Sequence, residues 1–325
     1  MKLKSIKSFQ KNYSQSNAME TKLTKKKQDE KCRLVCQLDS VLTKLSSEST
    51  VHVLIVKTSD GGMISLQWAN KDKSLLEIGN VLYVEFLDQK TDTNSDVTLD
   101  IEISDLQVLV SSYDISYLDM LFHHAEQPRD LIRLLQFIER IHDERIKQLL
   151  TELFQEKDIA VPFITLPASH NHHHNFAGGL LLHSIECAEL IETTAYSTLA
   201  TCEADLTLAT ALLHDLGKVE TMNPANKRQF VPHEALTLLL IEPFLMKLQK
   251  QWQQGADALR AMLSFLMGNN QFPQFPGLVL VKMADQFSSS IAARKMAFEG
   301  VPKHFYFSRL QTPSATQFFN RLTVS

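Results

Sequence analysis

Two stretches of the sequence place histidine and aspartate side chains at spacings that could bind a metal ion. Residues 172–183 read HHHNFAGGLLLH, and further along His214 stands directly before Asp215. An imidazole and a carboxylate near a helix end can face one cavity, where they offer a divalent cation a mixed set of nitrogen and oxygen donors. A lone histidine on an apolar helix, such as His183, is more often a hydrogen-bonded core residue, so its type alone indicates little.

A further carboxylate stands in an apolar segment later in the chain. The run LVLVKMADQF places Asp285 among aliphatic residues. Burying an unpaired carboxylate in such surroundings is costly, and a bound metal ion would remove that cost. We therefore treat Asp285 as a third candidate for the site suggested by His214 and Asp215.

The segments that must position these residues have a helical pattern from about Ile115 onward. Apolar residues recur at three- and four-residue intervals through residues 131–154, LIRLLQFIERIHDERIKQLLTELF, and predict one long connecting helix. Later apolar runs predict an all-α region with helices at residues 178–196, 204–216, 233–251, 255–268 and 277–298.

The region before these helices has β-type patterns. Five short runs separated by turn clusters such as SDGG and EIGN predict strands at residues 32–38, 51–58, 62–69, 81–88 and 97–103. Five strands in so short a stretch indicate a small closed barrel or a sandwich. Trp68, on the third run, would suit an OB-fold, whose open face binds nucleic acid, although a single tryptophan in a strand is more often a core residue.

Composition limits the class of protein. With 325 residues and 44% hydrophobic residues, the chain is long enough for two modest soluble domains. Its apolar runs are shorter than the roughly 20 residues of a membrane span, and its start lacks the apolar core of a secretory signal. We expect a cytoplasmic protein with no membrane partner. The four scattered cysteines predict free thiols rather than a disulfide framework.

The start of the chain is basic, whereas the remainder is acidic. Residues 1–30 contain eight lysines against three acids and are rich in polar residues, a composition that predicts a disordered tail. Such a tail could hold nucleic acid through counterion release. The more common interpretation of such a lysine-rich end is a solvated terminus that has no partner.

The ordered set formed by His183, the HD pair at 214 and 215, and Asp285 resembles the H…HD…D pattern of the HD-domain metal-dependent phosphohydrolases. Further details, NHHHNFAGGLLLH and LLHDLGK behind a five-stranded segment, resemble the OB-fold plus HD-domain 3′-to-5′ exoribonucleases of the YhaM type. The run LPASHNHHH and the glycine pair are also similar to the HD domain of MobH-type conjugative relaxases.

The resemblance implies that His183, His214, Asp215 and Asp285 bind the essential metal ion. It also implies that Lys218 faces the substrate phosphate. Beyond its role as a ligand, Asp215 could accept the proton of the attacking water. Histidine and carboxylate ligands without a thiolate favour Mn²⁺ or Fe²⁺, with Mg²⁺ or Ni²⁺ as alternatives.

The same resemblance separates the remaining histidines into those that match a family position and those that do not. His173 and His174 match a histidine pair that lines the site in the family, whereas His170 and His172 have no match and are interpreted as loop residues. His233, in VPHEAL, matches a histidine that helps to hold a second ion in two-metal members.

One segment departs from the two-metal pattern. Where such a member has a second histidine pair, this chain reads FLMGNNQFP, with Gly268, Asn269 and Asn270. Asparagine oxygens are poor replacements for imidazole at a transition-metal site. The pattern therefore does not predict a complete second metal site, and this leaves catalytic competence open.

Together these features predict an α+β protein in four parts: a basic tail (1–30), an OB-like barrel (31–112), connecting helices (113–160) and an all-α HD domain (161–325). The predicted function is metal-dependent phosphodiester hydrolysis, as a 3′-to-5′ exonuclease on single-stranded RNA, with DNA as a second substrate. The alternatives are a small-nucleotide phosphohydrolase and a non-catalytic HD protein that binds nucleic acid or protein. A homo-oligomer is left open.

Overall fold

The computed structural model describes residues 31–45, 50–69, 76–87, 101–109, 113–169, 174–224, 231–265, 273–311 and 315–322. The chain divides into two compact units, Met1–His123 and His124–Ser325. The basic tail predicted at residues 1–30 lies outside the described residues. The boundary between the units assigns most of the predicted connecting region to the second, helical unit.

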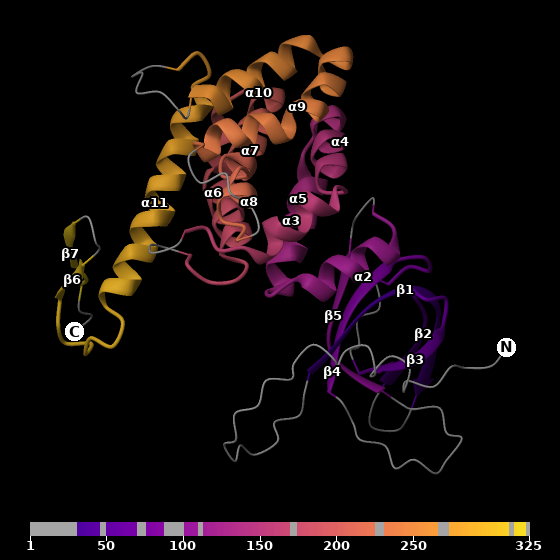
Figure 1. Ribbon diagram of the computed structural model, residues 1–325. Coiled ribbons are helices and arrows are strands. Elements are labelled where there is room, and N and C mark those ends of the chain that lie inside the picture. Colours follow the sequence, from indigo (N-terminus) through magenta and orange to yellow (C-terminus); the bar gives the residue numbers. More distant parts are fainter. Residues whose placement is uncertain are drawn as a thin grey trace. The chain divides into compact units, whose positions relative to one another are not determined.

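Within the described part of the first unit, five strands form a closed barrel (Figure 1). They follow the order β1-β2-β3-β5-β4, and their bounds are Lys31–Leu45 (β1), Thr50–Thr58 (β2), Met63–Trp68 (β3), Val81–Leu87 (β4) and Ile101–Leu109 (β5). The long β1 pairs antiparallel with both β4 and β2, and a register shift between Leu38 and Ser40 accompanies the change of partner. The parallel pair β3–β5 closes the barrel. The predicted order of a small barrel followed by a helical region is confirmed.

Apolar side chains fill the barrel interior. The buried cluster consists of Leu34, Cys36, Leu38, Leu54, Val56, Leu66, Leu82, Val84 and Ile103. Trp68 packs against this cluster, and its ring centroid lies 6.1 Å from that of the buried His52. Trp68 is therefore partly buried against the barrel core.

The fifth strand runs further than its sequence pattern predicted. We expected residues 97–103, of which 97–100 lie outside the described residues, whereas β5 continues to Leu109. The adjacent polar residues Ser104 and Asp105 interrupt the alternation of apolar and polar side chains. A register shift opposite Glu85 and Phe86 accommodates this interruption in the pairing with β4, because a bulge lets one strand carry an extra residue.

The second unit is mainly helical (Figure 1). After α2 (Ile115–His124), which spans the boundary between the units, come α3 (Pro128–Arg140), α4 (Glu144–Leu153), α5 (Lys157–Thr165), α6 (Gly179–Thr198), α7 (Thr201–Leu213), α8 (Lys218–Thr221), α9 (His233–Gln251), α10 (Gln253–Phe265) and α11 (Gly277–Ala297). Helices α6, α7 and α11 pack against one another, and α9 packs against α10 and α4. Among the described helices, none is long and apolar enough to cross a membrane.

The single long helix predicted over residues 131–154 is wrong, because the chain breaks into α3 and α4. Asp143 caps α4 by accepting a hydrogen bond from the backbone amide of Arg145 at 3.0 Å. The fully buried Asp205 on α7 accepts bonds from the backbone amides of His142 and Asp143, at 3.3 and 2.8 Å. The apolar spacing continues across the break, so periodicity alone does not reveal it.

The helical unit also ends in a β-hairpin that was not predicted. Strands β6 (Phe307–Gln311) and β7 (Thr316–Asn320) pair antiparallel. The rings of Phe307 and Phe318 stack across the pair with centroids 5.6 Å apart, which is the kind of cross-strand contact that stabilises a hairpin.

Candidate metal centre

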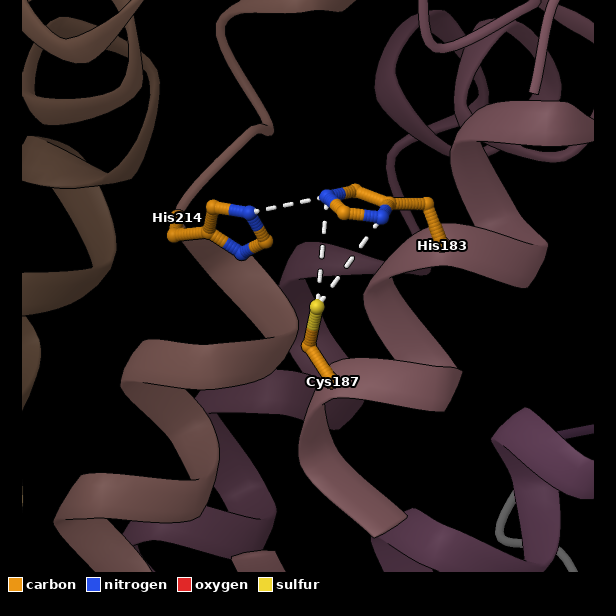
Figure 2. A group of neighbouring side chains, drawn as sticks. All are labelled: His183, Cys187 and His214. Carbon is orange, nitrogen blue, oxygen red and sulfur yellow. Dashed lines mark hydrogen bonds between the residues drawn. The ribbon is translucent and has the colours of Figure 1, made fainter. Parts of the chain in front are cut away.

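Two histidines from different helices face each other in the core of the helical unit. His183 lies on α6, and His214 follows the last residue of α7. Their Nε2 atoms are 3.3 Å apart (Figure 2). Both side chains are buried. Two ring nitrogens at this distance could both coordinate the same cation.

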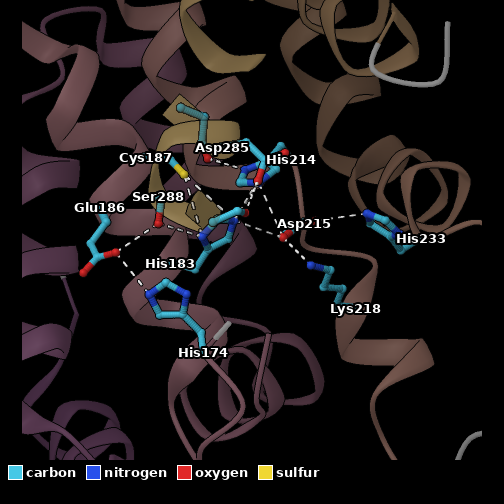
Figure 3. A network of polar contacts seen from close by, with 12 residues as sticks. His174, His183, Glu186, Cys187, His214, Asp215, Lys218, His233, Asp285 and Ser288 are labelled. Atoms are coloured by element: carbon cyan, nitrogen blue, oxygen red, sulfur yellow. Dashed lines mark hydrogen bonds and ion pairs between the residues drawn. The ribbon is translucent and has the colours of Figure 1, made fainter. Parts of the chain in front are cut away.

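Two carboxylates complete the cluster (Figure 3). His183 Nε2 lies 3.4 Å from Asp215 Oδ2 and 3.3 Å from Asp285 Oδ1. His214 Nε2 lies 3.5 and 4.0 Å from the same two oxygens. Donor atoms bound to one ion at about 2.0–2.2 Å lie roughly 3–4.4 Å apart. The printed histidine–carboxylate distances therefore match those expected between ligands that share one divalent metal ion.

The orientation of His214 supports this fit. Its Nδ1 lies 2.7 Å from the carbonyl oxygen of Ala211, and a carbonyl can only accept, so Nδ1 carries the hydrogen. In the neutral ring Nε2 is then the nitrogen with the free lone pair, and it faces the cluster. A histidine that ligates a metal commonly has its other nitrogen fixed in this way.

The ionisation states of the clustered side chains also favour the binding of a cation. Burial lowers the pKa of His183, and nearby His214 adds to this effect, so the His183 imidazole stays neutral at pH 7. Burial alone would raise the pKa of Asp215, but His214, the hydrogen bond from His233 and the charge of Lys218 outweigh it and hold this pKa well below its usual range. The pKa of Asp285 is also lowered, although partial burial opposes this, because His183 and His214 lie beside the carboxylate. Neutral imidazole and ionised carboxylate are the forms that bind metal.

Two more predicted residues, at the starts of α8 and α9, lie close to Asp215. Lys218 Nζ lies 2.6 Å from Asp215 Oδ2, and His233 Nε2 lies 3.0 Å from Oδ1. Gly217 makes the second contact feasible, because a Cβ at this position would overlap the carbonyl oxygen of His233. The amide of Gly217 also donates to Thr237 Oγ1 at 2.8 Å. The glycine of the HDLGK motif thus allows α9 to start against the HD turn.

The glycine pair before α6 has a related role. Gly178 adopts a positive φ of 82° at the start of the helix, and a Cβ on Gly179 would overlap the carbonyl oxygen of His174. These glycines hold His174 close to α6, with its ring centroid 5.2 Å from that of His183. His174 Nε2 lies 3.1 Å from Glu186 Oε2, so His174 borders the cluster without joining it.

Several predicted residues lie outside the described part of the chain. These are His170, His172 and His173, which precede α6 in the sequence, and Gly268, Asn269 and Asn270, which follow α10. The roles of His173 as a site-lining residue and of His233 at a second metal site stay predictions.

Sequence reasoning missed Cys187, which lies next to the histidine pair (Figure 2). Its Sγ is 3.9 Å from both ring nitrogens of His183, and it forms a potential ligand group with His183 and His214. Its position four residues after His183, on the same helix face, was the available signal. Burial raises the pKa of the Cys187 thiol, and the charge of Asp285 raises it further. Mn²⁺ prefers nitrogen and oxygen donors, so we expect Cys187 to line the wall of a manganese site, whereas zinc could displace the thiol proton and bind the sulfur.

Replacing Cys187 with alanine is therefore expected to change Mn²⁺ affinity by less than about threefold. The matched variant His183→Ala, one helical turn away, is expected to abolish stoichiometric binding because it removes a ligand. Isothermal titration calorimetry of the metal-free proteins measures both. A loss of tenfold or more in Cys187→Ala would instead make the sulfur a ligand and would favour zinc.

Comparisons with known proteins agree with the motifs. Residues 180–290 match the HD domain family. A protein of Halalkalibacterium halodurans named 3′-5′ exoribonuclease YhaM is 29% identical over 97 residues, which cover 30% of this chain and 29% of that protein. A protein of the same name from Shouchella clausii is 31% identical over 99 residues, which cover 30% of each. The resemblance to HD-domain proteins and to YhaM-type exoribonucleases is confirmed, and the matched segments span less than a third of either relative. The similarity to MobH-type relaxases stays a prediction.

Proposed function

We propose that this chain, which contains an HD domain over residues 180–290, is a metal-dependent phosphodiesterase that removes nucleotides from the 3′ end of single-stranded RNA. The observation that carries this proposal is the convergence of His183, His214, Asp215 and Asp285, with His183 Nε2 3.3–3.4 Å from a donor atom of each of the others. The substrate class is supported by the names of the two relatives. The presence of an OB-like barrel supports a single-stranded substrate.

In this proposal the four converging side chains hold Mn²⁺ or Fe²⁺, with Mg²⁺ or Ni²⁺ as alternatives. When bound, such an ion lowers the pKa of water and neutralises charge on the phosphoryl oxygens. Lys218 Nζ, at 2.6 Å from Asp215 Oδ2, brings a positive charge to the edge of the cluster. A phosphoryl oxygen that approaches the cluster would meet this ammonium group, which stabilises the charge that develops during hydrolysis.

The two carboxylate oxygens of Asp215 have different neighbours. Oδ2 faces the cluster, whereas Oδ1 lies 3.0 Å from His233 Nε2. The strongly lowered pKa of Asp215 makes it a weak base. It would therefore hold a proton from the attacking water, accepted at Oδ2, only transiently and pass it to the leaving 3′-oxygen of the shortened strand, while the hydrogen bond that His233 Nε2 donates to Oδ1 keeps the carboxylate in place.

The barrel and the remaining assignments complete the proposal. Because Trp68 is partly buried against the barrel core, we propose that the barrel holds the strand mainly through contacts to its phosphate backbone. We retain residues 31–112, 113–160 and 161–325 as proposed domain limits. A cytoplasmic location and the oligomeric state stay predictions.

Digestion of a 5′-labelled single-stranded RNA in the presence of Mn²⁺ tests the function. We expect a ladder that shortens from the 3′ end, slower cleavage of the matching DNA, and no ladder with His214→Ala. His304→Ala, which removes an exposed histidine, serves as the matched control and should cleave normally. Release of internal fragments would contradict exonuclease action. Hydrolysis of mononucleotides without cleavage of oligomers would instead support the small-nucleotide alternative.

A further inference from the structure

A second group of polar side chains lies behind His183, on the side away from the two aspartates (Figure 3). Ser288 Oγ, from α11, is 3.2 Å from His183 Nδ1 and 3.1 Å from Glu186 Oε2. The same carboxylate oxygen of Glu186 is 3.1 Å from His174 Nε2. His174, His183 and Ser288 are all buried. These contacts link the loop before α6, the helix α6 itself and α11.

The direction of each hydrogen bond in this group follows from the chemistry of its members. An ionised carboxylate only accepts, so both Ser288 and His174 donate to Glu186. Burial alone would raise the pKa of Glu186, but the hydrogen bond from His174 outweighs it and the pKa is lowered, which keeps this carboxyl ionised. Ser288 has a single hydroxyl hydrogen, and that hydrogen is directed to Glu186. The oxygen of Ser288 can then only accept from His183 Nδ1.

We propose that Glu186 and Ser288 are positioning residues that hold His183 in the tautomer with hydrogen on Nδ1 and a free lone pair on Nε2. This inference rests on the metal site of the proposed function, since Nε2 is the atom that faces His214, Asp215 and Asp285. His214 reaches the same state through the carbonyl of Ala211. The two histidines thus acquire matching tautomers by different means, one from backbone and the other from a side-chain relay.

If Glu186 and Ser288 act in this way, particular substitutions should weaken metal binding. Ser288→Ala removes the acceptor for Nδ1–H, and we expect Mn²⁺ affinity to fall by about 10- to 100-fold, as for other partners of ligating histidines. Ser288→Thr keeps a hydroxyl and should restore affinity to within about threefold. Glu186→Ala frees the serine hydroxyl to donate to Nδ1, which favours the wrong tautomer and should weaken binding to a similar extent.

A double substitution separates a relay from two independent structural contacts. If Glu186 acts through Ser288, adding Glu186→Ala to Ser288→Ala should cause little further loss of Mn²⁺ affinity, because the effects of residues in one network are not additive. Ser290→Ala is the matched control, since this exposed serine on the same helix bonds only to the carbonyl of Gln286 among the described contacts. Circular dichroism establishes that each variant is folded.

Long-range ¹H–¹⁵N spectra of the histidine rings in metal-free protein provide a readout that needs neither metal nor nuclease activity. We expect the Nδ1-protonated form of His183 in the wild type and in Ser290→Ala, and a mixture of tautomers in Ser288→Ala. An Nε2-protonated His183 in the wild type, additive losses in the double variant, or unchanged affinity in Ser288→Ala would each overturn the inference. Absence of nuclease activity with an intact tautomer and intact Mn²⁺ binding would count against the proposed function alone.

Discussion

Asp215→Asn is expected to lower the rate of RNA hydrolysis by at least about 10³-fold, equivalent to roughly 4 kcal/mol of transition-state stabilisation. The amide has nearly the same shape as the carboxylate, so the fold should persist. It lacks the negative charge that Asp215 contributes beside His183, His214 and Lys218. Its NH₂ group can also point at the lone pairs that would otherwise bind the ion. Metal binding and the activation of water should therefore fail together.

The measurement is the initial rate of digestion of a labelled RNA, with bound metal determined on the same sample. Asp257→Asn is a suitable control because Asp257 is an exposed aspartate on α10 that pairs with Arg260 at 3.3 Å. That control should retain full activity and metal content. If Asp215→Asn kept its rate within tenfold of the wild type, the HD pair could not be the centre of catalysis.

The same variant has a pH signature in the metal-free protein. The pKa of Asp215 is well below its usual range in the folded chain, although burial opposes this, because His214, His233 and Lys218 stabilise the charged form. A group with a depressed pKa contributes stability above its unfolded pKa, about 3.9 for aspartate, and loses that contribution as the pH falls through its folded value. The difference in unfolding free energy between wild type and Asp215→Asn should thus be greatest near neutral pH and shrink under acidic conditions.

Gly217→Ala is expected to destabilise the folded state by about 1–3 kcal/mol, a typical cost of inserting a methyl group into packed surroundings. The new Cβ would overlap the carbonyl oxygen of His233 and approach the amide of Thr237. The start of α9 must then move away from the HD turn. That movement would lengthen the contact of 3.0 Å between His233 and Asp215, and we expect RNA hydrolysis to fall by about 10- to 100-fold as reacting groups lose their alignment.

Urea denaturation and the rate of RNA digestion measure these two effects of Gly217→Ala separately. Gly300→Ala provides a comparison, because Gly300 has a positive φ of 70° and no neighbour that a Cβ would meet. It should cost about 1–2 kcal/mol through backbone strain and leave activity unchanged. Wild-type stability and activity in Gly217→Ala would show that close packing at this turn is not required.

Much of the candidate site could be predicted from the sequence because its signals are local. His214 and Asp215 are covalent neighbours, and the glycines of GGLLLH and HDLGK mark places where backbone segments approach closely. Asp285 was conspicuous as a carboxylate among aliphatic residues. In each case the residue types and their spacing within one segment indicated a site residue. The resemblance to HD-domain proteins then indicated that these separate segments contribute to one site.

Because sequence patterns are local, they also led to two errors in the predicted fold. The apolar period continues through residues 141–143, yet the backbone leaves the helix there because Asp205, more than 60 positions away in sequence, accepts the amides of His142 and Asp143. The end of β5 depends on its pairing with β4, which no pattern within residues 101–109 contains. Contacts between distant segments decided both outcomes.

The sequence by itself determined the ligand types of the site, because the identity of a donor atom is a property of its residue. Only the tertiary structure decided which other groups touch those ligands. Cys187 contacts His183 because α6 turns both toward the core, and Ser288 reaches His183 across 105 positions of sequence because α11 packs against α6. The rotation and the offset of two packed helices arise from the side chains that interlock between them, and a linear pattern does not specify that interlocking.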